Sequence, residues 1–267
     1  MSVKVVFCDV DGTLLNSDHR ILDSTMDAIR QINASGIRFV IVTARGPLGI
    51  YPIFKRYNFV CPMVCYSGAL VLDEEGNILQ SNTFLKETAQ AVISYIEEMQ
   101  MDCSWNIYSM NSWIVKNEDD ERVRREECIV EAKAKCGSVK DIPNGTGVSK
   151  ILCMCNPSKT VEIEEALKAK FPCLSIMRSS DILIEIMNKG ITKSGAVSFL
   201  CDSWQIPLES TIAFGDNYND YDMLKTVGEA FLMGNAPKEL QAEFKNVVRG
   251  NDEGGIYQGL KQLHIVK

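Results

Sequence analysis

The chain has 267 residues, of which 46% are hydrophobic and 24% charged, so it can bury one large core or two ordinary ones. Its net charge is −7, and no basic run is long enough to suggest a nucleic-acid ligand. No apolar run approaches membrane-spanning length, and the N-terminus lacks a signal-peptide pattern. We therefore expect a cytoplasmic protein with neither a membrane nor a nucleic-acid partner. These features do not indicate an oligomeric state.

The ten cysteines are scattered through apolar runs, and only two histidines are present. Cys61 and Cys65 are close in sequence, as are Cys153 and Cys155, but neither pair has a matching Cys or His pair elsewhere. This pattern argues against a zinc site and favours free thiols in a reducing compartment.

The first 66 residues alternate strands and helices in a βαβαβ pattern. Strands are predicted at 3–8, 37–42 and 62–66, helices at 23–35 and 47–57, and a hairpin at 68–80. The strands are apolar throughout, which is typical of a parallel sheet that is buried on both faces.

The predicted order of strands and helices changes near residue 83, where an α+β pattern with antiparallel pairing begins. It contains helix 86–101, hairpin 103–116, charged helix 119–135, strand 150–155, helix 158–169 and strands near 173–178 and 182–187. From about residue 188 the βα alternation resumes, with helices 193–202, 219–225, 237–244 and 254–263 and strands 210–214, 229–233 and 246–248. We therefore predict an α/β fold: a Rossmann-like, doubly wound parallel sheet core (1–82 and 188–267) with an inserted α+β cap domain (83–187).

Three apolar strands end in polar residues, namely Asp9, Thr43 and Asp216. Ligands bind at the carboxyl ends of strands in open parallel sheets, so these distant residues are expected to share one crevice. Asp11 lies two residues after Asp9, and carboxylates this close favour a cation beside them. Asp222, in the first turn of a predicted helix, is interpreted instead as a solvated charge.

Lys193 looks out of place in its own segment. Thr192 is a good helix N-cap, which puts Lys193 in the first turn, where the helix macrodipole disfavours a cation. A lysine is favourable there if a phosphate and several carboxylates lie nearby.

Clustered carboxylates favour a hard cation that prefers oxygen ligands, and Mg²⁺ fits best. Together with Lys193 and the Thr43 hydroxyl, Mg²⁺ would match the charge of a phosphoryl group from several sides. An aspartate can then attack phosphorus and form an aspartyl-phosphate, while a second aspartate cycles a proton. The residues therefore indicate phosphoryl transfer.

Four motifs in order, "DVDGTLL", "VTAR", "GITKSGA" and "GDNYND", resemble the signature of the haloacid dehalogenase (HAD) superfamily over nearly the whole chain. The insert, together with "MGNA" at 233–236, resembles the Cof-type sugar-phosphate phosphatases. This resemblance implies a Mg²⁺-dependent phosphatase that hydrolyses phosphate monoesters of small metabolites, sugar phosphates foremost, with the cap selecting the substrate.

The resemblance also implies roles for individual residues. Asp9 would be the nucleophile and Asp11 the general acid/base, and Mg²⁺ would be held by Asp9, the Asp11 main-chain carbonyl and Asp216. The implied phosphate-binding groups are those of Val10, Thr43, Ala44, Lys193 and Asn219, with Asp220 orienting Lys193 or the metal's water shell.

Three positions depart from the usual family pattern. Ala44 and Ser194 each stand where the family has glycine, and Ser67 stands where it often has asparagine. None of them is an implied nucleophile, acid or metal ligand, so they bear on substrate detail rather than on the reaction class.

Three alternatives remain. A phosphomutase of the same superfamily would use the same residues and return the phosphate to the sugar. A sugar-phosphate-binding regulator without turnover is a second alternative, against which the intact pair of Asp9 and Asp11 argues. A phospho-receiver domain also clusters Asp, Thr and Lys at strand ends, but such domains are about half this length.

Overall fold

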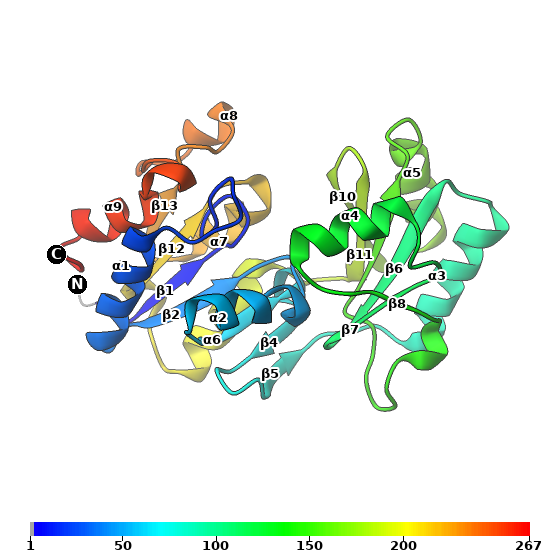
Figure 1. Cartoon of the computed structure of the whole chain (residues 1–267), viewed down its shortest axis with the longest axis horizontal. Coiled ribbons are helices and arrows are strands. Elements are labelled where there is room, and N and C mark those ends of the chain that lie inside the picture. The colour runs from blue at the N-terminus through cyan, green and yellow to red at the C-terminus, as the bar shows by residue number, and fades with distance from the viewer. Residues whose placement is uncertain (1–2) are drawn as a thin grey trace. The chain divides into compact units, whose positions relative to one another are not determined.

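The computed structural model describes residues 3–267, which form two compact units (Figure 1). Unit 1 takes in the chain up to Ala44, Phe59–Leu79 and Thr192–Lys267, and unit 2 contains Arg45–Asn58 and Gln80–Ile191. No helix formed by residues 3–267 has both the length and the apolar character that a membrane span needs. All ten cysteines are free.

Unit 1 is built on a seven-stranded sheet with the order β13-β12-β1-β2-β3-β4-β5. The strands are β1 (Val5–Cys8), β2 (Arg38–Val42), β3 (Met63–Cys65), β4 (Leu70–Leu72), β5 (Ile78–Ser81), β12 (Thr211–Gly215) and β13 (Glu229–Leu232). The five strands from β13 to β3 pair in parallel, and β4 pairs antiparallel with β3. Every residue of β1 is buried, because the sheet is covered on both faces. The predicted α/β fold with a parallel sheet core is confirmed.

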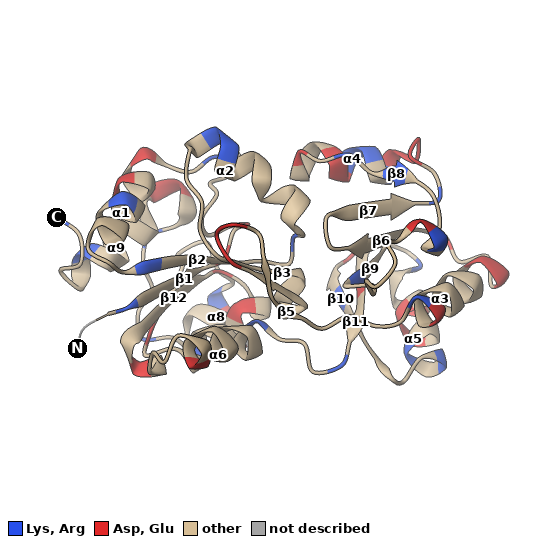
Figure 2. Cartoon of the chain, turned by 90° about the horizontal axis from the view of Figure 1, so that it is seen from below, with Lys and Arg blue, Asp and Glu red and all other residues tan. Residues whose placement is uncertain are grey.

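Helices cover the two faces of this sheet. They are α1 (Asp23–Ala34), α6 (Lys193–Ser203), α7 (Tyr221–Thr226), α8 (Lys238–Gln241) and α9 (Gly255–Gln262), with 3₁₀ turns η2 (Tyr66–Gly68), η4 (Leu208–Ser210), η5 (Tyr218–Asp220) and η6 (Asn251–Glu253). Val5 and Phe7 of β1 belong to one core cluster with residues of α6 and α7. In Figure 2, α1 and α9 lie on the opposite side of β1, β2 and β12 from α6.

Unit 2 has a six-stranded sheet with the order β10-β11-β9-β6-β7-β8. Its strands are β6 (Cys103–Ser109), β7 (Ser112–Val115), β8 (Lys135–Cys136), β9 (Lys150–Cys155), β10 (Leu174–Ser180) and β11 (Leu183–Asn188). Its helices are α2 (Tyr51–Tyr57), α3 (Lys86–Glu98), α4 (Glu121–Val130) and α5 (Thr160–Lys170), with 3₁₀ turns η1 (Pro47–Gly49) and η3 (Val139–Asp141). One core cluster joins α3 and α5 to one face of the sheet, and a second joins Val123 of α4 to Trp113 and Leu152.

Several predicted elements differ from the observed ones in their bounds; for example, the helix predicted over 237–244 covers only Lys238–Gln241 in α8. The helix predicted over 119–135 ends at Val130, because the buried Glu127 carboxylate accepts the Ala134 N–H at 2.8 Å and the Lys133 ammonium at 2.6 Å and so turns the chain back. The strand predicted at 246–248 is a single bridge between Leu232 and Val247. Its two hydrogen bonds run from the Leu232 N–H to the Asn246 carbonyl and from the Val248 N–H to the Leu232 carbonyl, both at 3.0 Å.

Candidate active site

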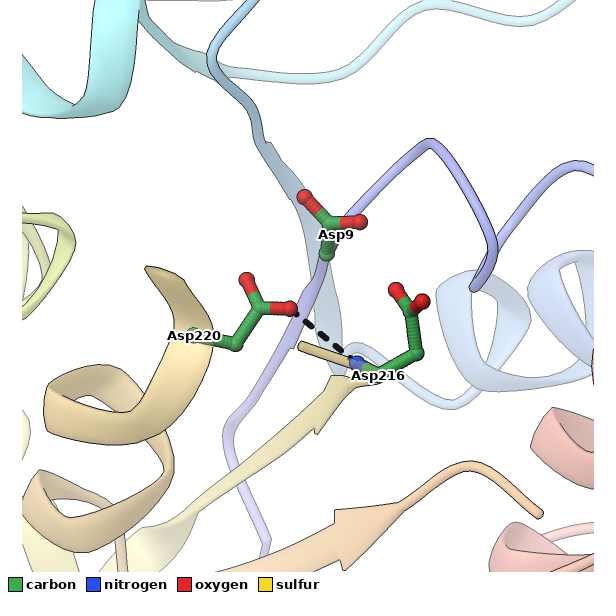
Figure 3. A group of neighbouring side chains, drawn as sticks. All are labelled: Asp9, Asp216 and Asp220. Atoms are coloured by element: carbon green, nitrogen blue, oxygen red, sulfur yellow. Dashed lines mark hydrogen bonds between the residues drawn. The ribbon is translucent and has the colours of Figure 1, made fainter. Parts of the chain in front are cut away.

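Three aspartates meet at one edge of the unit 1 sheet. Asp9 follows β1 directly and Asp216 follows β12, and these strands are parallel neighbours in which Cys8 pairs with Phe214. Asp220 ends the η5 turn just after β12. Figure 3 shows the three side chains together, and a carboxylate oxygen from each lies within 4.8 Å of the other two. The predicted meeting of distant residues at this edge is therefore present for Asp9 and Asp216.

Lys193 joins two of these carboxylates. Its ammonium lies 2.6 Å from Oδ1 of Asp9 and 2.6 Å from Oδ1 of Asp220, and the residue is 2% exposed. Lys193 is the first residue of α6, which begins after Thr192 accepts the Gly195 N–H on its side chain. Three carboxylates and one ammonium leave an excess of two negative charges in a largely buried cluster.

Both carboxylate oxygens of Asp220 accept hydrogen bonds from groups of the protein. Oδ2 accepts the backbone N–H of Asp216 at 3.0 Å (Figure 3). The same oxygen accepts the Asn217 N–H at 3.2 Å, and Oδ1 accepts from Lys193. The side chain is fully buried. Asp220 therefore fixes the start of the loop that carries Asp216, and it holds the Lys193 ammonium against Asp9.

A tight turn after β1 brings Gly12 and Thr13 against Asp216. The Thr13 hydroxyl donates to Asp216 Oδ1 at 2.9 Å. Gly12 has φ +81°, and a Cβ atom there would lie 2.4 Å from Asp216 Oδ2. Only glycine permits both this left-handed backbone and this close approach. The turn thus orients the Asp216 carboxylate.

Burial and mutual repulsion perturb the acids. Burial, followed by the charge of Asp220, raises the pKa of Asp9 well above its usual value despite the opposing ammonium of Lys193. The same two causes raise the pKa of Asp216 to about 6. Burial alone would lower the pKa of Lys193, but the charges of Asp220 and Asp9 outweigh it, so the pKa is raised and the side chain stays cationic. The cluster carries more negative charge than its own lysine can compensate.

The donor set fits a hard divalent cation. It offers only carboxylate oxygens, which Mg²⁺ and similar ions prefer, and it lacks the thiol and imidazole groups that softer ions favour. A divalent ion would cancel the two excess negative charges. Because Asp220 is already engaged with Lys193 and two backbone N–H groups, Asp9 and Asp216 are the better placed ligands.

The remaining residues singled out in the sequence lie at various depths around this edge. Asp11 is exposed, two residues beyond Asp9, and Val10 is buried between them. Thr43 is buried after β2, where its N–H donates to the Val64 carbonyl and its own carbonyl accepts the Ser67 N–H. Ala44 is half-buried and Asn219 is exposed within η5. The structure thus gathers Asp9, Asp216, Asp220 and Lys193, and the catalytic and binding roles of all these residues stay predictions.

Sequence reasoning missed two side chains that contact Asp216. Thr13 belongs to the quoted "DVDGTLL" motif but received no role, and Asn235 belongs to "MGNA". Asn235 could have been found in the same way as Asp9 and Asp216. Ligands bind at the carboxyl ends of parallel strands, and Asn235 is a polar residue just beyond strand β13.

The chain belongs to the haloacid dehalogenase-like hydrolase family, whose sequence profile matches residues 6–260. The predicted membership of the HAD superfamily is therefore confirmed, and the Cof-type resemblance is consistent with this family.

Curated relatives extend over almost the whole chain. A putative phosphatase from Haemophilus influenzae is 35% identical and covers 96% of each chain. The HMP-PP phosphatase of Klebsiella pneumoniae is 26% identical and covers 91% of this chain and 89% of its own. Among solved structures, a haloacid dehalogenase-like hydrolase from Bacteroides thetaiotaomicron superposes with a TM-score of 0.90 at 24% identity, covering 98% of this chain and all of that one. The structural likeness shows the shared fold. Family and relatives together confirm that the chain is an enzyme, a HAD-type phosphatase.

Proposed function

We propose that this enzyme is a Mg²⁺-dependent phosphatase that hydrolyses phosphate monoesters of small metabolites, sugar phosphates foremost, through an aspartyl-phosphate intermediate. The observation that carries the proposal is the Lys193 ammonium 2.6 Å from both Asp9 and Asp220, beside an Asp216 carboxylate that Thr13 orients. A buried nucleophile held by a cation, in an acidic site that needs a further cation, suits the attack on an anionic phosphoryl group.

Asp9 is the proposed nucleophile. Lys193 holds one carboxylate oxygen at 2.6 Å, which keeps the side chain in a fixed direction and favours its ionised form. That carboxylate attacks phosphorus, the alkoxide leaves, and an acyl phosphate forms on Asp9. Water then attacks phosphorus, which releases inorganic phosphate and regenerates the carboxylate.

Asp11 is the proposed proton carrier. It lies two residues beyond Asp9 and is exposed, so its carboxyl group is accessible to a substrate and to water. It would give a proton to the leaving alkoxide in the first step and take one from the attacking water in the second. The two acids of "DVD" thus divide the work between a buried nucleophile and an accessible acid/base.

The proposed cation ligands are Asp9, the Asp11 main-chain carbonyl and Asp216. When bound there, Mg²⁺ would neutralise charge on the phosphoryl oxygens. Lys193 and the Thr43 hydroxyl would bind the same group from the protein side, with the backbone N–H groups of Val10 and Ala44 and the Asn219 side chain. Both Lys193 and Thr43 are buried, which strengthens their interaction with an anion.

We further propose that the insert at about 83–187, which makes up most of unit 2, chooses among substrates. Every group named above belongs to unit 1 and serves the phosphoryl group that all candidate substrates share. Discrimination between leaving groups therefore needs other surfaces, and the insert is the largest part of the chain with no other assigned role. One relative is named for HMP-PP and one structural neighbour for sugar phosphates, so both belong in a substrate panel.

The reaction is tested by phosphate release from a panel of phosphate monoesters, with Mg²⁺ and with chelator. Chelator should silence the enzyme and Mg²⁺ should restore it, and product analysis should give free phosphate rather than an isomeric sugar phosphate. Asp9→Asn should abolish turnover without unfolding the protein. Asp222→Asn is the matched control, because Asp222 is an exposed aspartate outside the carboxylate cluster. Full activity in chelator, or more than a few per cent activity in Asp9→Asn, would contradict the proposal.

Substrate choice is tested separately by grafting the insert of another family member onto this core. The graft should change the ranking of substrates and leave the need for Mg²⁺ and Asp9 unchanged. If the ranking follows the core instead, the loop from Asn16 to Arg20 becomes the better candidate for substrate selection.

A further inference from the structure

Asn235 connects three loops beside the carboxylate cluster. It lies in the loop after β13, and its Nδ2 donates to the Gly12 carbonyl at 2.8 Å. The same Nδ2 lies 3.5 Å from Oδ2 of Asp216, while Oδ1 accepts the Asn251 N–H at 3.0 Å. One amide thus contacts the loops that follow β1 and β12 as well as the C-terminal η6 turn.

The backbone on both sides of Asn235 is fixed. The Gln241 side-chain amide donates to the carbonyls of Gly234 at 3.0 Å and Ala236 at 2.8 Å. Gly234 packs so closely that a Cβ atom would lie 2.7 Å from the Val248 carbonyl oxygen. The Asn235 side chain is therefore directed at Gly12 and Asp216 by its own loop, although the residue is exposed.

The groups that Asn235 contacts are those that set the direction of Asp216. Thr13 donates to one oxygen of this carboxylate at 2.9 Å, and Asn235 approaches the other. Gly12 directly precedes Thr13 in the chain, and its carbonyl accepts a hydrogen bond from the Asn235 amide. Loss of that amide would free both the Gly12–Thr13 peptide and one side of the Asp216 carboxylate.

We propose that Asn235 is a positioning residue for the cation site. It holds the Gly12 carbonyl and the Asp216 carboxylate in fixed positions relative to each other; this inference rests on the proposed function. An amide suits the task because its NH₂ group supplies two donors for two acceptors, and its oxygen takes the backbone N–H on the other side. Side chains that orient metal ligands without touching the metal commonly change metal affinity by about 10- to 100-fold when they are removed.

The experiment measures Mg²⁺ binding to the chelator-treated enzyme by calorimetry, without substrate. Asn235→Ala should weaken Mg²⁺ binding by about tenfold or more. Its melting temperature in chelator should match that of the wild type, and its kcat should recover at saturating Mg²⁺. Asn251→Ala is the control. The Asn251 side-chain amide also connects two of these loops, because it donates to the Leu15 carbonyl at 2.9 Å. The alanine variant loses this contact but keeps the backbone N–H that donates to Asn235. It should bind Mg²⁺ within about twofold of the wild type.

Different results refute different statements. If Asn235→Ala binds Mg²⁺ as well as the wild type does, the positioning role is refuted while the proposed reaction stands. If Asn251→Ala loses the same affinity, Asn235 only tethers loops and the inference is also wrong. If the wild type itself neither binds Mg²⁺ nor depends on it for activity, the cation site of the proposed function is refuted, and this inference with it.

Discussion

Replacing Lys193 by methionine removes the one ammonium that the structure places among three buried or half-buried carboxylates. Methionine follows the lysine side chain as far as Cε and keeps its apolar contacts, so the change removes little besides the ammonium group. In the wild type the cluster carries an excess of two negative charges, and in the variant it would carry three. Removing one partner of a buried ion pair typically costs about 3 to 5 kcal/mol, because the other charge stays buried without compensation.

We expect Lys193→Met to lower the free energy of unfolding by about that amount at pH 8 in chelator. The loss should shrink in Mg²⁺, since a bound cation would replace part of the missing charge. It should also shrink as the pH falls. Without the Lys193 ammonium, the folded-state pKa values of Asp9 and Asp216 would lie further above their unfolded values, so the folded state would bind more protons and become relatively more stable in acid.

The assay is urea denaturation followed by circular dichroism at pH 5.5 and pH 8, with Mg²⁺ and with chelator. Lys245→Met is the control in the same unit, because Lys245 is exposed and its side chain makes no hydrogen bond, ion pair or ring contact within residues 3–267. It should change stability by less than about 0.5 kcal/mol. A Lys193→Met variant within about 1 kcal/mol of the wild type at pH 8 in chelator would refute the reasoning, since it would mean that the carboxylates do not depend on Lys193.

Two further predictions concern the acids of the site. Asp11→Asn should still allow some phosphorylation of Asp9 but slow both leaving-group departure and hydrolysis, as rapid-quench measurement of the phosphoenzyme would show; wild-type rates would mean that the proton comes from elsewhere. In chelator, Asp216 should make the wild type less stable as the pH rises from about 4 to above 6, because its folded pKa of about 6 exceeds its unfolded value and the folded state therefore binds more protons in that range. Thermal unfolding of Asp216→Asn should lack this component, and equal pH dependence in both proteins would contradict it.

Much of the site edge follows from local sequence pattern. Asp9 and Asp216 each end a run of apolar residues, and such runs become neighbouring parallel strands whose carboxyl ends lie at one edge. The pattern does not predict which hydrogen bonds the Asp220 carboxylate accepts, because its partners come near only when the turn is folded. The position of Asn235 likewise depends on hydrogen bonds to Gly12 and Asn251, which no periodicity in the sequence records.

The end of helix α4 likewise depends on contacts that the local sequence pattern does not record. The charged residues of 119–135 favour a helix throughout, yet α4 ends at Val130 because one carboxylate finds better partners. Glu127 satisfies the Ala134 N–H and the Lys133 ammonium only if the chain turns back, and the chain does so through Glu131 with φ 53°. A tertiary hydrogen bond to a charged group contributes about 1.5 to 3 kcal/mol, which exceeds the propensity of the few residues that leave the helix.

Lys193 illustrates how tertiary interactions can outweigh a local preference. A cation in the first turn of a helix loses about 0.3 to 1 kcal/mol to the macrodipole, so the local rule disfavours it. The two ion pairs at 2.6 Å, to Asp9 and Asp220, reverse that preference, because their loss would leave buried charge uncompensated at a cost several times larger. A residue that breaks a weak local rule at the start of a helix next to strand-end carboxylates is therefore informative. The unfavourable position of Lys193 in the first helical turn is tolerated because its ion pairs with Asp9 and Asp220 outweigh the effect of the macrodipole.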